Sequence, residues 1–399
     1  MDSTYNQNQN NRPAARRLRQ KAQDIVFIGP VDHTILWVVM LLTMIGVVMV
    51  FSASYLYCST HADTNYDMFY YLKRQGLYAV IGVLVMLFMS NWNYHHLKRF
   101  AVPLYLVCTG LLAGVQVFGK SVNGARRWIE LPVIGQFQPS EIAKVGVILM
   151  VALVIAAKPD ILKKWTGFLL MVAIVLVPVG LGALGSMSAA IILGVIGIGM
   201  LFAASPHIWR FVIPGFLGAG GMVTYFLTRP AGAGGFRAGR FAAWLNPFAD
   251  QSQYGYQVIQ SLYAIASGGL FGLGLGQSRQ KTFLPEAQND IIFSIICEEL
   301  GLVGATLILA LFGILIWRGI KVALNSPDTF GSLTALGITL TIAAQVIINV
   351  AVVTNSIPNT GVPMPFISAG GTALIIMLFM AGILLNISRH SKKIGENEG

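Results

Sequence analysis

Hydrophobic residues run through this chain in long blocks separated by short polar stretches. A helix that crosses the hydrocarbon core of a bilayer needs about 20 consecutive apolar residues. Ten blocks approach that length, at residues 34–54, 76–91, 100–118, 139–157, 167–187, 189–204, 210–228, 291–317, 333–354 and 370–387. The pattern therefore predicts an all-α polytopic membrane protein with ten transmembrane helices.

The polar stretches divide the chain into three parts. Residues 1–32 are Asn/Gln-rich and carry several arginines, which predicts a disordered basic cytoplasmic tail. Residues 33–388 form the ten-helix membrane domain, and residues 389–399 form a cytoplasmic C-terminal tail. No signal peptide is indicated, because the first apolar block is longer than a signal h-region. The longest polar stretch, 229–290, is a large extracytoplasmic loop between helices 7 and 8, in which we expect a helix over 256–271.

Composition excludes a soluble enzyme. Hydrophobic residues make up 55% of the 399 residues and charged residues 11%, whereas soluble domains carry about a quarter charged residues. The ten spans leave no stretch for a separate soluble catalytic domain, so any chemistry lies in loops or between helices. The three cysteines and six histidines are dispersed, which gives neither a disulfide framework nor the spacing of zinc ligands. We expect no metal site built by the protein.

The basic residues indicate the orientation. With both termini in the cytoplasm, sixteen of the 27 Lys and Arg residues lie inside and ten lie outside, in agreement with the positive-inside rule. Eight of the ten outer ones fall in two loops, 119–138 and 229–290. An anionic ligand would explain them, and so would arginines that extend toward lipid headgroups. The net charge of +11 does not indicate nucleic-acid binding, because the basic residues form no single patch.

An aspartate stands at the junction between the long loop and the eighth predicted helix. The sequence LPEAQND at 284–290 runs directly into an apolar block, with Asp290 at its end. This residue type at this place favours a helix N-cap. It is also placed to act as a general base toward a sugar hydroxyl at the membrane boundary, and the two roles do not exclude each other. Glu286 is the alternative base.

Four charged residues fall within predicted spans, where charge is costly and indicates function or pairing. Glu141 and Lys144 are three residues apart on one helical face, which predicts a structural ion pair between them. Glu298 and Glu299 are consecutive in the eighth span. Their side chains point about 100° apart on a helix, so we expect one of them to face a polar cavity.

Two further loops carry features of a binding site. Arg126 and Arg127 stand beside Trp128, a combination that suits an interfacial anchor as well as a phosphate clamp. The stretch 358–374 has three prolines and three glycines between two spans. A non-helical hairpin at membrane depth is tolerated only when it is buried in protein or lines a cavity. We therefore expect this stretch to form a wall of a site.

Several motifs, in order along the chain, resemble those of the SEDS family, the shape, elongation, division and sporulation proteins. The resemblance covers roughly residues 33–388. The AQND before the eighth predicted helix is more similar to the division and sporulation members than to the elongation members. The motifs are VFSAS at 50–54, GARRWI at 124–129, QPSEIAK at 138–144, NPFAD and YGYQ within 246–257, SGGLFGLGLGQSRQK at 267–281, LPEAQNDIIFSIICEELG at 284–301 and NTGVPMPFISAGG at 359–371.

The resemblance implies an inverting peptidoglycan glycosyltransferase that polymerises lipid II at the outer face of the bacterial cytoplasmic membrane, in septal cell-wall synthesis. It implies that Asp290 is the general base. It also implies that outer-loop residues bind the pyrophosphate and the sugars, and the candidates are Arg126, Arg127, Arg237, Arg240, Lys281, Glu286 and Ser368. A divalent cation, Mg²⁺ or Mn²⁺, carried on the substrate phosphates is compatible with this chemistry.

The partners that the resemblance implies are lipid II, the undecaprenyl-pyrophosphate-linked glycan, a class B penicillin-binding protein with transpeptidase activity, and division-complex proteins. Two other functions stay open. A lipid II flippase would need a continuous polar pathway, for which the candidates are Glu141, Lys144, Glu298 and Glu299. A non-catalytic scaffold that recruits a transpeptidase would not need Asp290.

The chain departs from the family pattern at two places. Ser186, in GSMS at 185–188, stands where the family usually has an aspartate. Ala369 follows Ser368 where the family usually has a tyrosine. No role of that aspartate or that tyrosine is therefore expected in this chain.

Overall fold

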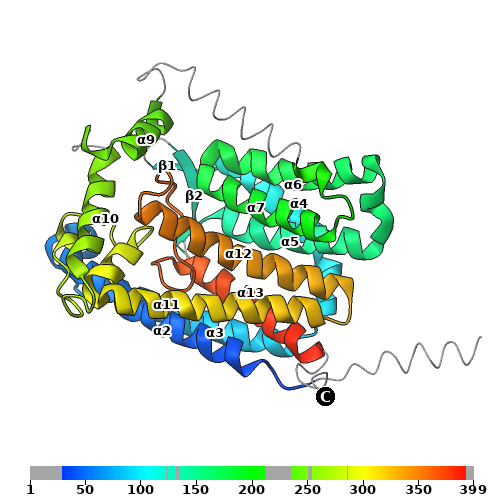
Figure 1. Ribbon diagram of the computed structural model, residues 1–399, viewed down its shortest axis with the longest axis horizontal. Helices are drawn as coiled ribbons and strands as arrows, with labels where there is room; N and C mark the ends of the chain where they lie inside the picture. Colours follow the sequence, from blue (N-terminus) through cyan, green and yellow to red (C-terminus); the bar gives the residue numbers. More distant parts are fainter. Residues whose placement is uncertain are drawn as a thin grey trace, which may run out of the picture.

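The structure of the chain, a computed structural model, describes residues 29–122, 125–131, 135–212, 235–249, 254–284 and 286–391. Within these ranges nine helices are long and apolar enough to cross a membrane, and Figure 1 shows them side by side. They are α2 (His33–Thr60), α3 (Tyr70–Asn91), α4 (Leu97–Phe118), α5 (Pro139–Ala157), α6 (Trp165–Gly185), α7 (Met187–Ala204), α11 (Ile292–Asn325), α12 (Thr329–Val353) and α13 (Gly371–His390). The prediction of a multi-pass helical membrane protein is confirmed.

The two ends of the described chain meet at one face of the bundle. The amide of Gly29 donates to the carbonyl of Arg389 at 2.8 Å, and the amide of Asp32 donates to the hydroxyl of Ser388 at 3.1 Å. The Asp32 carboxylate caps the start of α2 and pairs with Arg318 of α11 at 2.6 Å. The start of α2, the end of α13 and the C-terminal part of α11 are thereby tied together.

The described helices do not include the seventh predicted span. That block, 210–228, falls mainly on residues 213–234, which lie outside the described residues. Its flanks lie at opposite ends of the bundle. Arg210 donates to the carbonyl of Leu162, after α5, at 2.5 Å, whereas Arg240 donates to the carbonyl of Asn359, after α12, at 3.1 Å. The count of ten helices stays a prediction. A transmembrane helix over 210–228 requires its two flanks to lie at opposite ends of the bundle, as they do here.

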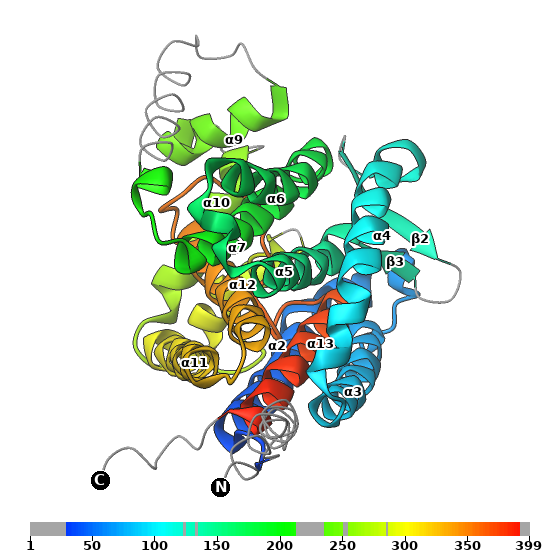
Figure 2. The same cartoon turned by 90° about the vertical axis from the view of Figure 1, so that its right-hand side faces the viewer.

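The centre of the bundle is formed by α5, α12 and α13. In their membrane-spanning windows 67%, 61% and 67% of the residues are buried, against 22% for the span that contains α4. Figure 2, which looks toward the helix ends, places α5 between α4, α7 and α12. Peripheral helices expose large apolar side chains such as Leu84 and Phe88, as a surface that faces lipid requires. The sequence pattern did not distinguish central from peripheral helices, because both are apolar.

The loop between α4 and α5 forms a small sheet that the all-α prediction did not include. Its strands are β1 (Lys120–Val122), β2 (Ala125–Leu131) and β3 (Gly135–Phe137), antiparallel in the order β1-β2-β3. In the register of β2 and β3, Ile129 pairs with Phe137. Two of the strands are three residues long, too short for a recognisable alternation of polar and apolar positions.

The long loop contributes two more helices, α9 (Gly235–Leu245) and α10 (Tyr254–Gly268). The second agrees with the helix predicted over 256–271. α9 is held to the end of α12 by two hydrogen bonds, because the Trp244 indole donates to the Asn355 carbonyl at 3.0 Å and the Asn355 carboxamide donates back to the Trp244 carbonyl at 3.3 Å. Short 3₁₀ turns complete the chain at Ala62–Thr64, Tyr94–His96, Pro159–Lys163, Pro247–Ala249 and Gln280–Thr282.

The helix α11 is interrupted at Gly301, whose φ of +68° and ψ of −173° lie outside the helical region. A side chain does not fit there, because a Cβ would come within 2.3 Å of the amide nitrogen of Gly272. Backbone groups of residues 269–274 and 298–303 bond each other at 2.9 to 3.1 Å. The loop after α10 thus satisfies backbone groups that the break in α11 would otherwise leave unpaired at membrane depth.

Candidate active site

A polar cavity of about 590 Å³ opens beside the start of α11. Residues of α3, β2, α5, α7, α9, α10 and α12 line it, together with the stretch between α12 and α13. That stretch contributes residues 361–363 and 369–370, so the predicted wall of a site is confirmed. The charged side chains at the cavity are Arg74, Arg127, Glu141, Lys144, Arg240, Glu286 and Asp290.

Asp290 lines this cavity immediately before α11. The N-cap residue of α11 is Ile291, and no side chain caps the helix there. The interpretation of Asp290 as a side-chain cap is therefore wrong. Its carboxyl group is directed to the cavity and not to the helix start.

The surroundings of Asp290 change its affinity for a proton. Burial raises the pKa of the Asp290 carboxyl above its ordinary value, and nearby Glu286 raises it further. The backbone amide of Asp290 itself, Arg240 and Arg127 act in the opposite direction and lower this pKa. A carboxyl group whose pKa lies above the usual range accepts a proton from a substrate more readily, as a general base must.

Two neighbours lie against Asp290, one at its main chain and one at its carboxylate. The carboxamide of Asn349 on α12 donates to the Asp290 carbonyl at 2.6 Å and to the Val362 carbonyl at 2.7 Å. Gly361 has a φ of +67°, and a Cβ on it would come within 3.0 Å of Asp290 Oδ2. The stretch after α12 therefore lies directly against the carboxylate, and glycine provides both the backbone conformation and the space.

Two of the predicted pyrophosphate ligands line the cavity from different elements. Arg127 of β2 donates from Nε to the Gly185 carbonyl at 2.9 Å, and Arg240 of α9 is held by the Asn359 carbonyl. These carbonyl contacts orient the two guanidinium groups, whose planar shape suits phosphate oxygens. Arg74 of α3 also lines the cavity. The sequence predictions did not single it out, although it belongs to the surplus of outer basic residues.

The ion pair that helical spacing indicated is present. Lys144 Nζ lies 2.7 Å from Glu141 Oε2, and both side chains are buried. Mutual neutralisation makes the burial of two charges tolerable, because either charge alone would be strongly unfavourable. The pair also lines the cavity. It is therefore packed within the helix bundle and at the same time borders the space in which a ligand would bind.

Arg126 does not line the cavity, so the structure does not bring it together with the other predicted ligands. It neighbours Arg127 on β2, and successive side chains of a strand point to opposite faces. Its guanidinium donates to the carbonyls of Gln116 and Val117 at 2.7 and 3.2 Å and is exposed. Arg126 therefore fastens the sheet to the end of α4. The side chain of Arg237, in α9, lies outside the described residues, so its predicted role stays a prediction.

Ser368 also has a different place from the one predicted. Its hydroxyl accepts from the amide of Met364 at 2.7 Å, and its carbonyl accepts from the carboxamide of Gln75 at 3.3 Å. The residue is buried and does not line the cavity, whereas the next residue, Ala369, does. Ser368 thus shapes the stretch that forms the wall and is not itself a ligand candidate.

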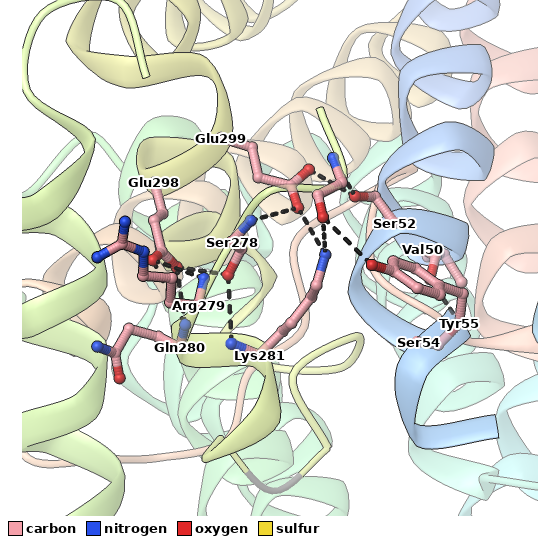
Figure 3. A network of polar contacts seen from close by, with 11 residues as sticks. Val50, Ser52, Ser54, Tyr55, Ser278, Arg279, Gln280, Lys281, Glu298 and Glu299 are labelled. Atoms are coloured by element: carbon pink, nitrogen blue, oxygen red, sulfur yellow. Dashed lines mark hydrogen bonds and ion pairs between the residues drawn. The ribbon is translucent and has the colours of Figure 1, made fainter. Parts of the chain in front are cut away.

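Lys281 is buried away from the cavity, in the network shown in Figure 3. Its ammonium donates to the Gly276 carbonyl at 2.6 Å, pairs with Glu299 at 3.3 Å and lies 4.5 Å from the ring centroid of Tyr55. The structure therefore does not bring Lys281 together with the cavity arginines, and its charge neutralises a buried glutamate.

Both glutamates of α11 belong to the same network, so the prediction that one of them faces a polar cavity is wrong. Glu298 accepts from the amide of Arg279 at 2.9 Å and from the hydroxyl of Ser278. Glu299 accepts from the hydroxyl of Ser52 on α2 at 2.5 Å. The two carboxylates therefore join α2, α11 and the loop after α10, as Figure 3 shows.

The serine at the family's aspartate position lies at the cavity. Ser186 stands between α6 and α7, and its hydroxyl accepts from the amide of Ala189 at 3.4 Å as the cap of α7. Ser188, on the first turn of α7, donates to the carbonyl of Thr360. Both serines line the cavity. The helix break at this position thus supplies polar groups in place of the missing carboxylate.

A metal site built by side chains is not found in the part of the chain that the structure describes, where no three His, Cys, Asp or Glu residues are grouped to hold an ion. The carboxylates that line the cavity are Glu286, Asp290 and Glu141, the last of them paired with Lys144. A divalent cation carried on substrate phosphates stays a prediction.

The fold and the site define a class of protein, a polytopic membrane protein whose polar cavity holds a carboxyl group among arginines. The family of cell cycle proteins FTSW/RODA/SPOVE matches residues 32–393. The chain belongs to this family, to which the SEDS motifs pointed.

Two relatives are similar over nearly their whole length. Stage V sporulation protein E of Bacillus subtilis (strain 168) is 42% identical over 380 residues, which cover 90% of this chain and 98% of that protein. A protein of Geobacter sulfurreducens (strain ATCC 51573 / DSM 12127 / PCA), named probable peptidoglycan glycosyltransferase FtsW, is 42% identical over 371 residues, which cover 90% and 96%.

Two solved structures have a similar fold. One is a chain from work described as structural coordination of polymerization and crosslinking by a peptidoglycan synthase complex. It is 26% identical with a TM-score of 0.73, and the match covers 91% of this chain and 99% of that one. The rod shape determining protein RodA of Thermus thermophilus is 26% identical with a TM-score of 0.65, and the match covers 91% and 98%.

Proposed function

We propose that this chain is a peptidoglycan glycosyltransferase that polymerises lipid II into glycan strands at the outer face of the bacterial cytoplasmic membrane. Family membership and the name of the Geobacter relative support this reaction. The observation that carries the proposal is the Asp290 carboxyl at a cavity that also holds Arg127 and Arg240. Transfer from a lipid pyrophosphate to a sugar hydroxyl needs both a base and cationic groups.

In this mechanism Asp290 accepts the proton of the 4-hydroxyl of the acceptor N-acetylglucosamine. The acceptor oxygen attacks C1 of the N-acetylmuramic acid at the lipid-linked end of the growing chain. The new C1–O bond forms while the bond between C1 and the pyrophosphate oxygen breaks, and the configuration at C1 inverts. A general base of this kind contributes about 10²- to 10⁴-fold to the rate.

The electron pair of the broken bond leaves with undecaprenyl pyrophosphate. The negative charge that develops is best stabilised by cationic groups held in place before the reaction. Arg74, Arg127 and Arg240 line the cavity from three different elements and are assigned this role. A divalent cation bound to the phosphates would supply further charge stabilisation, which removal of divalent cations with EDTA and their restoration as Mg²⁺ or Mn²⁺ would measure.

The proposed setting has both termini in the cytoplasm and the cavity outside. A class B penicillin-binding protein would crosslink the strands, and the similarity to a chain of a complex for polymerization and crosslinking supports such a partner. We assign the chain to septal wall synthesis together with division-complex proteins. The relative named stage V sporulation protein E and the relative named FtsW are equally similar, at 42% identity, so a role in sporulation fits as well as one in division.

The test is polymerisation of purified lipid II by the purified protein, with and without its transpeptidase. We expect glycan strands from the wild type and none from Asp290→Asn, which keeps the shape of the side chain and cannot accept the proton. Thermal unfolding of both proteins checks that the variant is folded. Strand formation by folded Asp290→Asn would refute the role of Asp290 as base.

A lipid II flippase has less support. It would need a polar pathway that joins Glu141 and Lys144 with Glu298 and Glu299. Among the described residues the first pair lines the cavity, whereas the second pair is bonded within the loop network of Figure 3. Lipid II translocation in proteoliposomes without strand formation would favour a flippase, and full function of Asp290 variants would favour a scaffold.

A further inference from the structure

One wall of the cavity carries polar side chains that the proposed transfer does not use. The helices α5 and α12 run antiparallel, and a Cβ on Gly337 of α12 would come within 2.8 Å of Ile148 of α5. Eight residues from this contact along each helix, toward the cavity, lie Gln345 on α12 and Ser140 on α5. Both line the cavity, as does Lys144 one turn further along α5.

Polar groups of this wall have fewer hydrogen-bond partners among the described residues than they can bind. Oε1 of Gln345 and the hydroxyl of Ser140 are buried and have no hydrogen-bond partner among the described residues. Gln345 is 3% exposed and Ser140 is 6% exposed. The Lys144 ammonium makes one hydrogen bond in the described structure, to Glu141 at 2.7 Å, although it has three donors. Buried polar atoms are nearly always paired, so this set indicates a ligand.

The three groups together specify the chemistry of that ligand. Oε1 of Gln345 is an acceptor and needs a donor, whereas Lys144 and Ser140 offer donors and need an acceptor oxygen. A phosphate group carries acceptors and, when ionised, no donor, so it cannot satisfy Gln345. A secondary amide carries a donor, its N–H, and an acceptor, its C=O, on adjacent atoms and directed to opposite sides. Both sugars of lipid II carry such a group as their acetamido substituent.

We propose that Gln345, Ser140 and Lys144 form a subsite for the acetamido group of one sugar of the membrane-linked substrate. Gln345 accepts from the N–H, and Lys144 and Ser140 donate to the C=O. This inference rests on the proposed function, because it names a contact with the substrate of that reaction. The subsite belongs to α5 and α12, whereas the cavity arginines come from α3, β2 and α9, so amide and pyrophosphate are recognised by different elements.

The test compares the binding of three lipids to Gln345→Met, which keeps the side-chain length and removes the carboxamide. Binding is measured in the Asp290→Asn background, so that no lipid is consumed. The lipids are lipid II, lipid II with both acetamido groups replaced by acetoxy groups, and undecaprenyl pyrophosphate. We expect Gln345→Met to weaken lipid II binding about five- to tenfold and to leave undecaprenyl pyrophosphate binding unchanged. The acetoxy analogue should bind both proteins alike, because an ester has no N–H to donate to Gln345.

Three results would overturn the proposal. Equal weakening for all three lipids would show a general disturbance of the cavity. Weakening for the acetoxy analogue as large as for lipid II would assign the contact to another donor, such as an amide of the stem peptide. A wild-type protein that fails to polymerise lipid II would refute the proposed function, whereas an active wild type with unaltered lipid II binding by Gln345→Met would refute the subsite alone.

A second variant keeps the test decisive if Gln345→Met does not fold. Ser140→Ala removes a hydroxyl that has no partner among the described residues, so its Tm should equal that of the wild type. We expect lipid II binding to weaken about two- to fivefold and undecaprenyl pyrophosphate binding to stay unchanged. Arg126→Gln is the matched control, since Arg126 lies outside the cavity, and it should alter neither. Unchanged lipid II binding by Ser140→Ala would overturn the proposal.

Discussion

Asn349 of α12 holds the main chain of Asp290, because its carboxamide nitrogen lies 2.6 Å from the Asp290 carbonyl. The same nitrogen lies 2.7 Å from the carbonyl of Val362, in the stretch that lies directly against the Asp290 carboxylate. One side chain thus holds the proposed base and that stretch together. Neither contact involves the Asp290 carboxylate, so Asn349 is a positioning residue.

Replacement of Asn349 should therefore affect turnover more than binding. We expect Asn349→Leu to lower kcat about 10- to 100-fold, because a general base displaced by about 1 Å loses much of its effect. KM for lipid II should change less than about threefold. Initial rates of polymerisation over a range of lipid II concentrations measure both constants. A loss confined to KM would show that Asn349 contributes to binding and not to positioning.

The rate of polymerisation should depend on pH through Asp290. Burial raises the pKa of Asp290 above 3.8, so the acid limb of the rate should lie at higher pH than that of an exposed aspartate. Arg240 lowers this pKa, and its removal in Arg240→Gln should raise it. The acid limb of kcat against pH, recorded at saturating lipid II, should therefore move to higher pH in the variant. An acid limb at the same pH in both proteins would contradict this assignment.

The same shift predicts how stability depends on pH. A carboxyl whose pKa is higher in the folded state than in the unfolded state binds its proton more tightly when folded. Its contribution to stability is therefore present below 3.8 and is lost as pH rises through the folded pKa. Tm measured across this range should fall less in Asp290→Asn than in the wild type. A steeper fall in the variant would have the wrong sign.

The neighbouring arginines of β2 provide a matched pair of variants. Arg127 lines the cavity and Arg126 faces the end of α4. We expect Arg127→Gln to lower kcat/KM for lipid II about 10- to 100-fold, since it removes a charged donor from the proposed pyrophosphate site. Arg126→Gln should stay within about twofold of the wild type. Equal losses in both variants would mean that the sheet as a whole, and not one guanidinium, is required.

The buried pair of Lys281 and Glu299 should matter for stability. Lys281→Met leaves a buried carboxylate unpaired, which costs about 3–5 kcal/mol of unfolding free energy. The double variant Lys281→Met/Glu299→Gln should recover much of this loss, as thermal unfolding in detergent can show. Lys73→Met, which breaks the exposed pair with Asp67, is the control and should change Tm little. Additive losses in the double variant would contradict the pairing.

Much of the architecture could be predicted from the sequence, because the bilayer imposes one length on every apolar helix. Asp290 could be found for two reasons, its place between a polar loop and an apolar block and the motif around it. Lys281 could not be paired with Glu299, eighteen residues away, because the loop between them has no periodicity that fixes their distance. In the sequence, Lys281 is indistinguishable from the other basic residues of the outer loops.

The arginines of β2 show a second limit. From the sequence alone, two adjacent arginines are equally good ligand candidates. Arg126 and Arg127 can be distinguished only when they are known to lie on a strand, where neighbouring side chains point to opposite faces. Gln345 illustrates the opposite case, since a lone glutamine within an apolar block is a visible signal. The sequence predictions named the charged residues within the spans and not Gln345.

The junction of α11 with the loop after α10 determines where the chain can accept mutations. A Cβ on Gly268, Gly272 or Gly301 would come within 1.9 to 2.3 Å of a backbone atom across the junction, so any side chain there separates two main chains. Leu270 and Phe271, between the first two glycines, are 62% and 80% exposed. The smallest residues of this segment are therefore its least replaceable ones, whereas its large hydrophobic residues can be exchanged for other apolar residues.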